Sequence, residues 1–290
     1  MKDFKDKVAV ITGAASGIGR GIAERCAQEG MKVVITDVEK EALGQTAREM
    51  KAAGATVLPL LTDVSKKRDV ENLARKTLNR YGAVHLLFNN AGVTTGTVIW
   101  ESTVADWKWV LGVNLWGVIH GIQVFVPIML KQDTECHIVN TASMAALISY
   151  PGRGIYTVSK HAVLSLSEKL YHELSWQGAK IKVSVLLPGS VKTRIMEADR
   201  NRPAGLRDDS GEEKKLSSGY EALNYMGRLA LESGIPPQQV ADCVFSAIRE
   251  DKFYIITHPE MKPLVQMRAD DILRERNPTN PFADLMPPWQ

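Results

Sequence analysis

The sequence predicts a single α/β domain in which helices cover both faces of a doubly wound, mainly parallel sheet of seven strands. Seven short runs rich in Val, Ile and Leu alternate with longer amphipathic segments along the chain. Most of the runs are nearly continuous in apolar residues, which is typical of parallel strands buried on both faces. Repeated strand–helix–strand units imply right-handed crossovers between parallel strands. The predicted strands are Val8–Thr12, Lys32–Asp37, Thr56–Leu61, His85–Asn89, His137–Thr141, Lys182–Leu187 and Phe253–Thr257.

Segments with the length and periodicity of helices separate these strands. Gly30, Gly54 and Gly82 directly follow three of the segments, at the position where helix C-termini favour glycine. The predicted helices are Ile18–Glu29, Lys40–Ala53, Lys66–Tyr81, Asp106–Leu130 and Tyr156–Trp176.

The composition is that of an ordinary globular protein, with 44% hydrophobic and 24% charged residues among 290. Thirty-six basic and 33 acidic residues give a net charge of +3, too small to indicate nucleic-acid binding. The three cysteines, Cys26, Cys136 and Cys243, form no C-x-x-C pair, and the six histidines are scattered. We therefore predict no disulfide framework and no metal site. No apolar run typical of a signal peptide or a membrane span follows the charged N-terminal segment, so we expect a cytoplasmic protein that does not bind membranes.

A polar, charged segment runs from Ser190 to about Gly219. Such a run is often a solvated surface loop, but this one follows a predicted strand at the sheet edge where α/β proteins bind ligands. Because long loops inside compact domains are usually functional or disordered, we predict a substrate lid over residues 190–235, with Gly205, Gly211 and Gly219 as candidate hinges. Residues 1–257 should form the domain. The Pro-rich residues 258–290 should form a C-terminal extension that packs on the body or on a neighbouring subunit.

A glycine-rich turn, Thr12-Gly13-Ala14-Ala15-Ser16-Gly17-Ile18-Gly19, joins the first predicted strand to the first helix. Its glycines permit a tight turn and a close approach of the backbone to a diphosphate, and free N–H groups at the start of the helix favour that anion. Glycines also mark plain turns, but the position between the first strand and the first helix favours a dinucleotide site.

An acidic residue, Asp37, ends the second predicted strand, 18 residues after Gly19. In dinucleotide-binding folds an acid near this position hydrogen-bonds the adenosine ribose. Asp37 would also repel a 2′-phosphate, and we expect no basic residue beside it to bind one, since Ser16 and Val38 are both uncharged. The alternative is a solvent-facing Asp that caps the next helix. We predict that the cofactor is NAD in preference to NADP.

Tyr156 and Lys160 lie four residues apart at the start of a predicted helix and therefore share one face of it. A phenol has an ordinary pKa of about 10 and is a poor base at neutral pH. A neighbouring ammonium group and a positive nicotinamide ring would both lower that pKa and prepare the phenol for proton transfer with an alcohol or carbonyl oxygen. Taken alone, the pair could equally be a surface helix pair.

Three further features support an active site at the same edge of the sheet. Ser143 closes the fifth strand, 13 residues before Tyr156, where it can hydrogen-bond the reacting oxygen. Asn89-Asn90-Ala91-Gly92 ends the fourth strand. Asn114 lies in an apolar helical pattern, where a polar residue needs a buried partner. Each could be structural by itself, and together they favour catalysis.

Together these motifs resemble the short-chain dehydrogenase/reductase family over roughly Lys7 to Thr257, with a Rossmann-like fold. The resemblance implies that Tyr156 is the catalytic acid/base and that Ser143 orients the substrate oxygen. It also implies that Lys160 holds the nicotinamide ribose and lowers the pKa of the phenol, and that Asn114 positions a water in a proton relay. The motifs are Thr12-Gly-x-x-x-Gly-Ile-Gly19, Asp63-Val64, Asn89-Asn-Ala-Gly92, Asn114, Ser143, Tyr156-x-x-x-Lys160 and Pro188-Gly189.

The resemblance also implies the cofactor contacts. Asp63 and Val64 would meet the adenine ring, and Asn90 with Gly92 the adenosine side. Val191 and Thr193, which follow Pro188-Gly189, would bind the carboxamide of the nicotinamide. The predicted cofactor residues are Gly13, Ser16, Gly17, Ile18, Gly19, Asp37, Val38, Asp63, Val64, Asn90, Ala91, Gly92, Tyr156, Lys160, Pro188, Gly189, Val191 and Thr193.

The leading functional hypothesis is an NAD-dependent dehydrogenase (EC 1.1.1.-) that interconverts a secondary alcohol and a ketone. The competing hypothesis is a non-catalytic NAD(H)-binding redox sensor or scaffold. Such a protein would have no reason to keep together Ser143, Tyr156, Lys160 and Asn114. An epimerase or dehydratase of the extended branch would favour a glycine spacing other than Gly13-x-x-x-Gly17-x-Gly19.

Candidate substrate residues form an apolar, adaptable set, which predicts a bulky alicyclic or aryl alcohol. Ordinary core packing is the alternative for each of them. The opening Lys2-Asp3-Phe4 and the strand Tyr254-Ile255-Ile256 resemble dehydrogenases that oxidise lignin-derived aryl alcohols. The candidates are Thr94, Thr95, Met144, Tyr150, Ile195, Met196, Tyr225 and Met226.

The segments Asp106–Leu130 and Tyr156–Trp176 carry more apolar residues than one buried face requires. The family resemblance implies that they pair with a symmetry mate in a four-helix contact, giving a homodimer or homotetramer. The apolar residues in question include Trp109, Trp116, Val124, Phe125, Val163 and Leu166.

Overall fold

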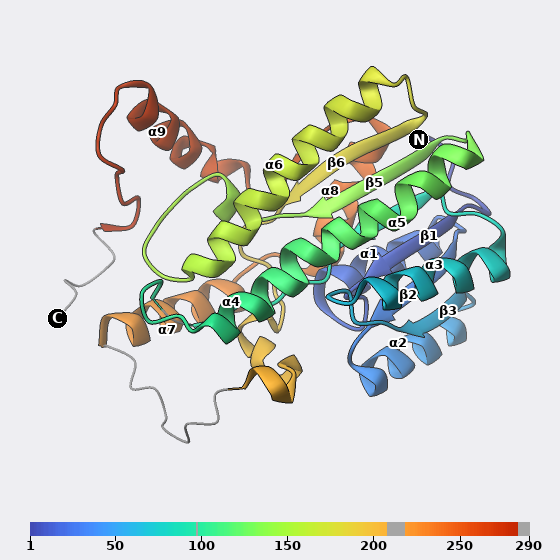
Figure 1. The fold of residues 1–290 in the computed structure, drawn as a ribbon, viewed down its shortest axis with the longest axis horizontal. Coiled ribbons are helices and arrows are strands. Elements are labelled where there is room, and N and C mark those ends of the chain that lie inside the picture. Colours follow the sequence, from blue (N-terminus) through green and yellow to red (C-terminus); the bar gives the residue numbers. More distant parts are fainter. Residues whose placement is uncertain (97, 208–217, 284–290) are drawn as a thin grey trace.

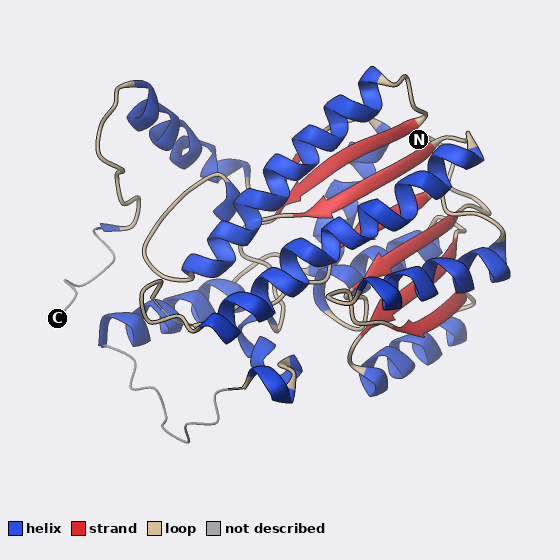
Figure 2. Cartoon of the chain, in the orientation of Figure 1, coloured by secondary structure: helices blue, strands red, loops and turns tan. Residues whose placement is uncertain are grey.

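The computed structural model describes residues 1–96, 98–207 and 218–283. In these residues seven strands form a sheet of order β3-β2-β1-β4-β5-β6-β7, and all neighbouring strands are parallel. Helices lie on both faces of the sheet (Figure 2). The predicted fold class is confirmed, with the sheet wholly rather than mainly parallel. The strands are β1 (Val8–Thr12), β2 (Lys32–Asp37), β3 (Thr56–Leu61), β4 (Leu86–Asn89), β5 (Cys136–Thr141), β6 (Ile181–Leu187) and β7 (Tyr254–Ile256).

The chain adds strands to one side of β1 first and then to its other side. From there β2 and β3 extend the sheet on one side, and β4 to β7 extend it on the other. The carboxyl ends of β1 and β4 therefore border a crevice, which is where open α/β sheets bind their ligands. Every residue of β1, β4 and β5 is buried, and this explains the mainly apolar character of β1 and β4. In β5 the buried His137 and Asn140 side chains have hydrogen-bond partners.

Two layers of helices enclose the sheet (Figure 1). The apolar side chains of α1, α2 and α8 form one core against β1 and β2, and those of α3, α5 and α6 pack on the other face. The sequence analysis did not predict α8, although Val240, Val244 and Ile248 recur at helical spacing and are fully buried. The helices are α1 (Gly17–Gln28), α2 (Lys40–Ala52), α3 (Lys67–Tyr81), α4 (Val104–Leu111), α5 (Gly117–Gln132), α6 (Gly154–Trp176), α7 (Ser218–Glu232), α8 (Pro237–Arg249) and α9 (Lys262–Leu273).

The predicted helix Asp106–Leu130 is longer than expected and not uniform. A π-helical turn, Gly112–Trp116, joins α4 to α5 and carries Asn114. The continuous helix Val104–Gln132 is long enough to span a membrane, and an 18-residue window of it has a mean hydropathy of 1.6, which was not predicted from the sequence. Its Phe125 side chain is fully buried in the core against the sheet, and such packing is also typical of a core helix in a globular domain.

The chain after β6 forms more regular structure than the lid prediction assumed. Short 3-10 helices at Ile195–Asn201 and Ala204–Leu206 precede α7. Part of the predicted lid, residues 208–217 with the candidate hinge Gly211, lies outside the described residues. The C-terminal extension contains α9, in which Pro263 stands in the first turn, where helices accept proline.

Candidate active site

A cavity of about 610 Å³ lies at the carboxyl edge of the sheet. Every predicted cofactor residue except Gly19 lines it, and so does Ser143. Gly19 packs under the glycine-rich turn instead, where a Cβ would collide with the carbonyl oxygen of Gly13. The structure therefore brings together residues from the ends of six strands that are far apart in the sequence.

The glycine-rich turn has the shape that a diphosphate site needs. Gly13 has φ 65°, a left-handed conformation that favours glycine, and its Cα faces the backbone of Ala91 too closely for a side chain. The Asn90 side-chain amide donates to the carbonyl of Thr12 at 2.9 Å, so the loops after β1 and β4 hold each other. Ser16 precedes α1 without a side-chain capping bond, which leaves the first N–H groups of that helix free for an anion.

The Asp37 carboxylate lies at the end of β2, beside the glycine-rich turn. It accepts hydrogen bonds from the backbone N–H groups of Ala15 and Glu39, both at 3.0 Å. Burial raises the pKa of Asp37, and these two donors oppose the rise. The carboxylate thus orders the turn as well as lining the cavity.

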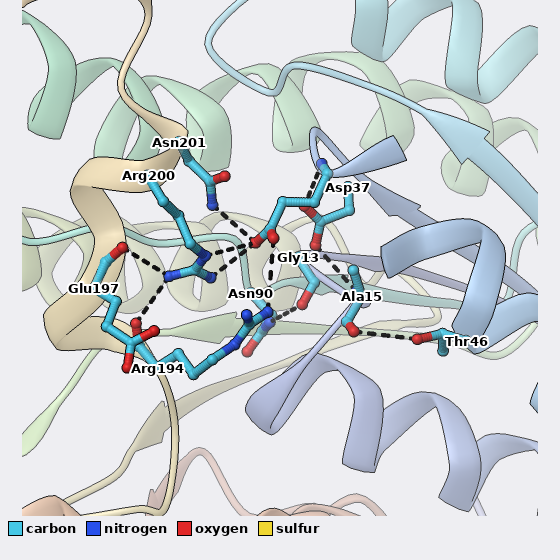
Figure 3. A network of polar contacts seen from close by, with 10 residues as sticks. Gly13, Ala15, Asp37, Thr46, Asn90, Arg194, Glu197, Arg200 and Asn201 are labelled. Carbon is cyan, nitrogen blue, oxygen red and sulfur yellow. Dashed lines mark hydrogen bonds and ion pairs between the residues drawn. The ribbon is translucent and has the colours of Figure 1, made fainter. Parts of the chain in front are cut away.

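The prediction that no positive charge stands near Asp37 is wrong. Arg194, Arg200 and Asn201 surround the Glu39 carboxylate. Figure 3 shows these three side chains in one polar network with Asp37. Arg200 pairs with Glu39 at 2.8 Å, and Arg194 pairs with it at 3.6 Å. Although burial acts to raise the pKa of Glu39, the hydrogen bonds from Arg200 and Asn201 hold it below its ordinary value. The prediction considered only sequence neighbours, whereas these arginines come from the segment after β6.

The Tyr156 ring and the Lys160 ammonium group lie together on the cavity wall. The Nζ atom of Lys160 is 5.5 Å from the centroid of the Tyr156 ring and donates a 2.8 Å hydrogen bond to the carbonyl of Thr141. Burial lowers the pKa of Lys160 from 10.5 to about 8. Burial raises the pKa of Tyr156, and a hydrogen bond with Ser143 opposes that rise. In the protein by itself, exclusion of water therefore outweighs the lowering that the sequence analysis expected from nearby cations.

The Asn114 side chain does not line the cavity. Its Oδ1 accepts from the N–H of Val93 at 2.8 Å, and its Nδ2 donates to the carbonyl of Val93 and to Oγ of Ser159. These bonds tie the π-helical turn to the loop after β4 and to α6. Both N–H groups of the amide are used, whereas Oδ1 keeps one lone pair, so a water could bind this side chain only by donating to Oδ1.

The family model for short chain dehydrogenases matches residues 7–204 of this sequence. The chain belongs to the short-chain dehydrogenase/reductase family. It is therefore an oxidoreductase of class EC 1.1.1.- that binds NAD(P), which sets aside the hypothesis of a non-catalytic sensor or scaffold.

Three similar proteins illustrate the match. A dehydrogenase/reductase of CLA biosynthesis from Lactiplantibacillus plantarum is 36% identical, over 96% of this chain and 97% of the relative. The 1-deoxy-11-beta-hydroxypentalenate dehydrogenase of Streptomyces exfoliatus is 31% identical, over 98% and 95%. A crystal structure of a short-chain dehydrogenase/reductase from Burkholderia phymatum in complex with NAD has a TM-score of 0.93 and 48% identity, and covers 97% of this chain and 99% of that one.

Five of the eight candidate substrate residues of this dehydrogenase line the cavity: Thr94, Met144, Tyr150, Ile195 and Met226. The other three do not. Thr95 is buried behind the wall, the sulfur of Met196 faces the Arg153 guanidinium, and Tyr225 is 64% exposed on α7. Tyr225 follows Asn224 and precedes Met226, which both line the cavity, so helix geometry turns its side chain outward.

Sequence reasoning missed two groups of the dehydrogenase's cavity residues. Met261 and Phe282 come from the C-terminal extension, and the ring of Phe282 meets that of Tyr150 edge-on at 5.2 Å. Ile148 and Arg153 come from the loop before α6. Phe282 of the extension thus contacts Tyr150 at the cavity, and no local pattern in the sequence indicated that contact.

Proposed function

We propose that this enzyme is an NAD-dependent dehydrogenase that interconverts a bulky apolar secondary alcohol and the corresponding ketone. The observation that carries the proposal is the position of Tyr156, Ser143 and Lys160 on the wall of the cavity that begins at the glycine-rich turn. The turn is a cradle in which added side chains at Gly13 or Gly19 would collide with backbone, and α1 presents its N-terminus there. These features fit a dinucleotide.

The chain's own residues would handle the proton. The nicotinamide, when bound, supplies or accepts the hydride. Tyr156 Oη would hold the proton that moves to or from the substrate oxygen, and Ser143 Oγ would hydrogen-bond the same oxygen. The Lys160 ammonium would hold the cofactor ribose and stabilise the phenolate by its charge.

Absorbance at the NADH band, followed across a panel of secondary alcohols with NAD or NADP, tests the proposal directly. We expect turnover of alicyclic or aryl alcohols with NAD. NADH binding without turnover of any alcohol or ketone in the panel would contradict the proposed reaction.

Replacing Asp37 by Ala should narrow the preference for NAD over NADP, because the carboxylate that repels the 2′-phosphate is gone. Val38→Arg in that background should narrow it further, since a guanidinium suits phosphate geometry. The measurement is kcat/KM for the two cofactors. Equal use of NAD and NADP by the wild type would show that our interpretation of Asp37 is wrong.

Glu39 should be a second determinant of cofactor choice, because it holds two arginines beside the ribose end of the cavity. We expect Glu39→Gln to strengthen the binding of 2′,5′-ADP relative to ADP several-fold by freeing Arg200 for the 2′-phosphate. Titration calorimetry with both nucleotides measures this. Glu41→Gln, an exposed acid in the first turn of α2, is the matched control and should leave the ratio unchanged.

We also propose that the enzyme is a homodimer or homotetramer formed through α5 and α6. Trp109, Phe125 and Val163, expected on that surface, lie inside the protein, so they cannot take part. Of the other residues expected there, Trp116 is 51% exposed, and Val124 and Leu166 are half-buried. Trp176, at the end of α6, was not among them and is 91% exposed. Burial of such rings favours association, so light scattering should give a mass of at least twice the 32.0 kDa of the chain. A monomer mass at micromolar concentration would contradict this proposal.

A further inference from the structure

The substrate end of the cavity holds a positive charge that the proposed reaction does not use. Arg153 directly precedes α6 and lines the cavity together with Ser143 and Tyr156. Burial raises the pKa of the Tyr156 and Tyr150 phenols, and the charge of Arg153 opposes the rise at both. The guanidinium therefore lies within electrostatic reach of the reacting hydroxyl.

Arg153 has no carboxylate partner within the described parts of the chain. Its Nη2 atom lies 2.7 Å from Sδ of Met196, and a thioether is only a weak acceptor. Arg200 and Arg202, in the segment after β6, differ from Arg153 because each of them pairs with an acidic side chain. A half-buried guanidinium on a largely apolar wall loses hydration without regaining it from an anion.

Two features of the structure accompany this position of the Arg153 side chain. Arg153 has φ 52°, a left-handed conformation that is uncommon and strained for a residue other than glycine. In α7, Gly227 faces Nη2 of Arg153, and a Cβ there would require the guanidinium to move. Strain of this kind concentrates at ligand sites, which points to a binding role.

We propose that Arg153 binds a carboxylate of the substrate, so that the substrate is an apolar secondary alcohol or ketone bearing a carboxylate away from the reacting carbon. This inference rests on the proposed function and adds the charge of the substrate to it. The planar guanidinium suits both oxygens of a carboxylate. Met144, Ile148 and Met226, on the same cavity wall, would contact the apolar body.

The test compares charged and uncharged forms of one probe series. Secondary hydroxy acids of increasing length between carbinol and carboxyl are assayed with NAD beside their methyl esters, on the wild type, Arg153→Gln and Arg153→Lys. Arg228→Gln, an exposed charge on the same α7 that Arg153 contacts, is the matched control. Circular dichroism and the Kd for NADH verify that each variant folds and binds cofactor.

We expect the wild type to prefer the acids, and Arg153→Gln to lower kcat/KM for them about tenfold to a hundredfold, mainly through KM. The esters should change little in Arg153→Gln, Arg153→Lys should retain part of the preference for acids, and Arg228→Gln should match the wild type. Equal use of acid and ester by the wild type would overturn the inference. An equal loss for both forms in Arg153→Gln would also overturn it, because it would make Arg153 only a structural contact to α7.

Failure of the proposed function gives a different result. If no acid or ester is turned over although NADH binds, the reaction class is wrong. Binding of the same acids and esters to the enzyme–NADH complex, measured by calorimetry, then decides the inference. Tighter binding of the acids that disappears in Arg153→Gln supports it, and equal binding of acids and esters refutes it.

Discussion

Tyr156→Phe should lower kcat by about 10²–10⁴-fold, the usual contribution of a positioned acid/base. The change removes one hydroxyl and keeps the ring beside Lys160. Packing and the Kd for NADH should therefore stay nearly unchanged. Steady-state turnover on the best alcohol and fluorescence titration with NADH measure the two quantities separately.

The pH profile gives a further check on Tyr156. Burial raises the pKa of this phenol in the free protein, and bound cofactor and Lys160 should lower it. The rate of alcohol oxidation should therefore rise with pH until the phenol is ionised. The residual activity of Tyr156→Phe should lack this rise. If the variant kept most of the activity, the proton would move through another group and the mechanism would be wrong.

Lys160→Ala should lower kcat at least about a hundredfold and also weaken NADH binding, which distinguishes it from Tyr156→Phe. The substitution removes the charge that favours phenolate, the proposed ribose contact and the hydrogen bond to the Thr141 carbonyl. Loss of turnover with an unchanged Kd for NADH would contradict the ribose contact.

The lowered pKa of Lys160 should also make the free energy of unfolding depend on pH. Its pKa is about 8 in the folded protein and 10.5 ordinarily, so between these values the unfolded chain binds more protons than the folded one. Stability from this group must then increase as the pH rises from 8 towards 10.5, by at most about 1.4 kcal/mol per pH unit. Below pH 8 the cost of burying the charge is present in full. Urea midpoints at both ends of this range should show the increase in the wild type and not in Lys160→Ala.

Local patterns were enough to predict the sheet and most of the positions that line the cavity. Runs made mostly of apolar residues predicted all seven strands, including β3 and β7, which are only partly buried at the two edges of the sheet. Residues such as Asp37, Ser143 and Gly189 stand at or directly after strand ends, so parallel pairing alone brings them to one edge.

Contacts between distant segments were not predictable in this way. Glu39 and Arg200 are 161 residues apart, and Phe282 reaches Tyr150 from the extension. Sequence spacing within one helix indicates which charge is near Tyr156, but the pKa also depends on how much water the fold excludes, which spacing does not encode. The partners of Asn114 were not predictable either, because only the fold shows that both N–H groups of its amide are bound by Val93 and Ser159.

The segment that carries Arg200 and Arg202 contacts the rest of the protein through two ion pairs that differ in burial. Arg200 holds Glu39 in a partly solvated pair, whereas Arg202 holds the nearly buried Asp106 of α4 at 2.7 Å and lies over the Trp109 ring. Ion pairs open to solvent contribute about 0–1 kcal/mol, and breaking a buried pair costs far more. Thermal motion should therefore break the Arg200–Glu39 contact first, while the Arg202–Asp106 contact holds the segment in place. The nucleotide could then exchange at its adenosine end while the wall around the substrate stays assembled.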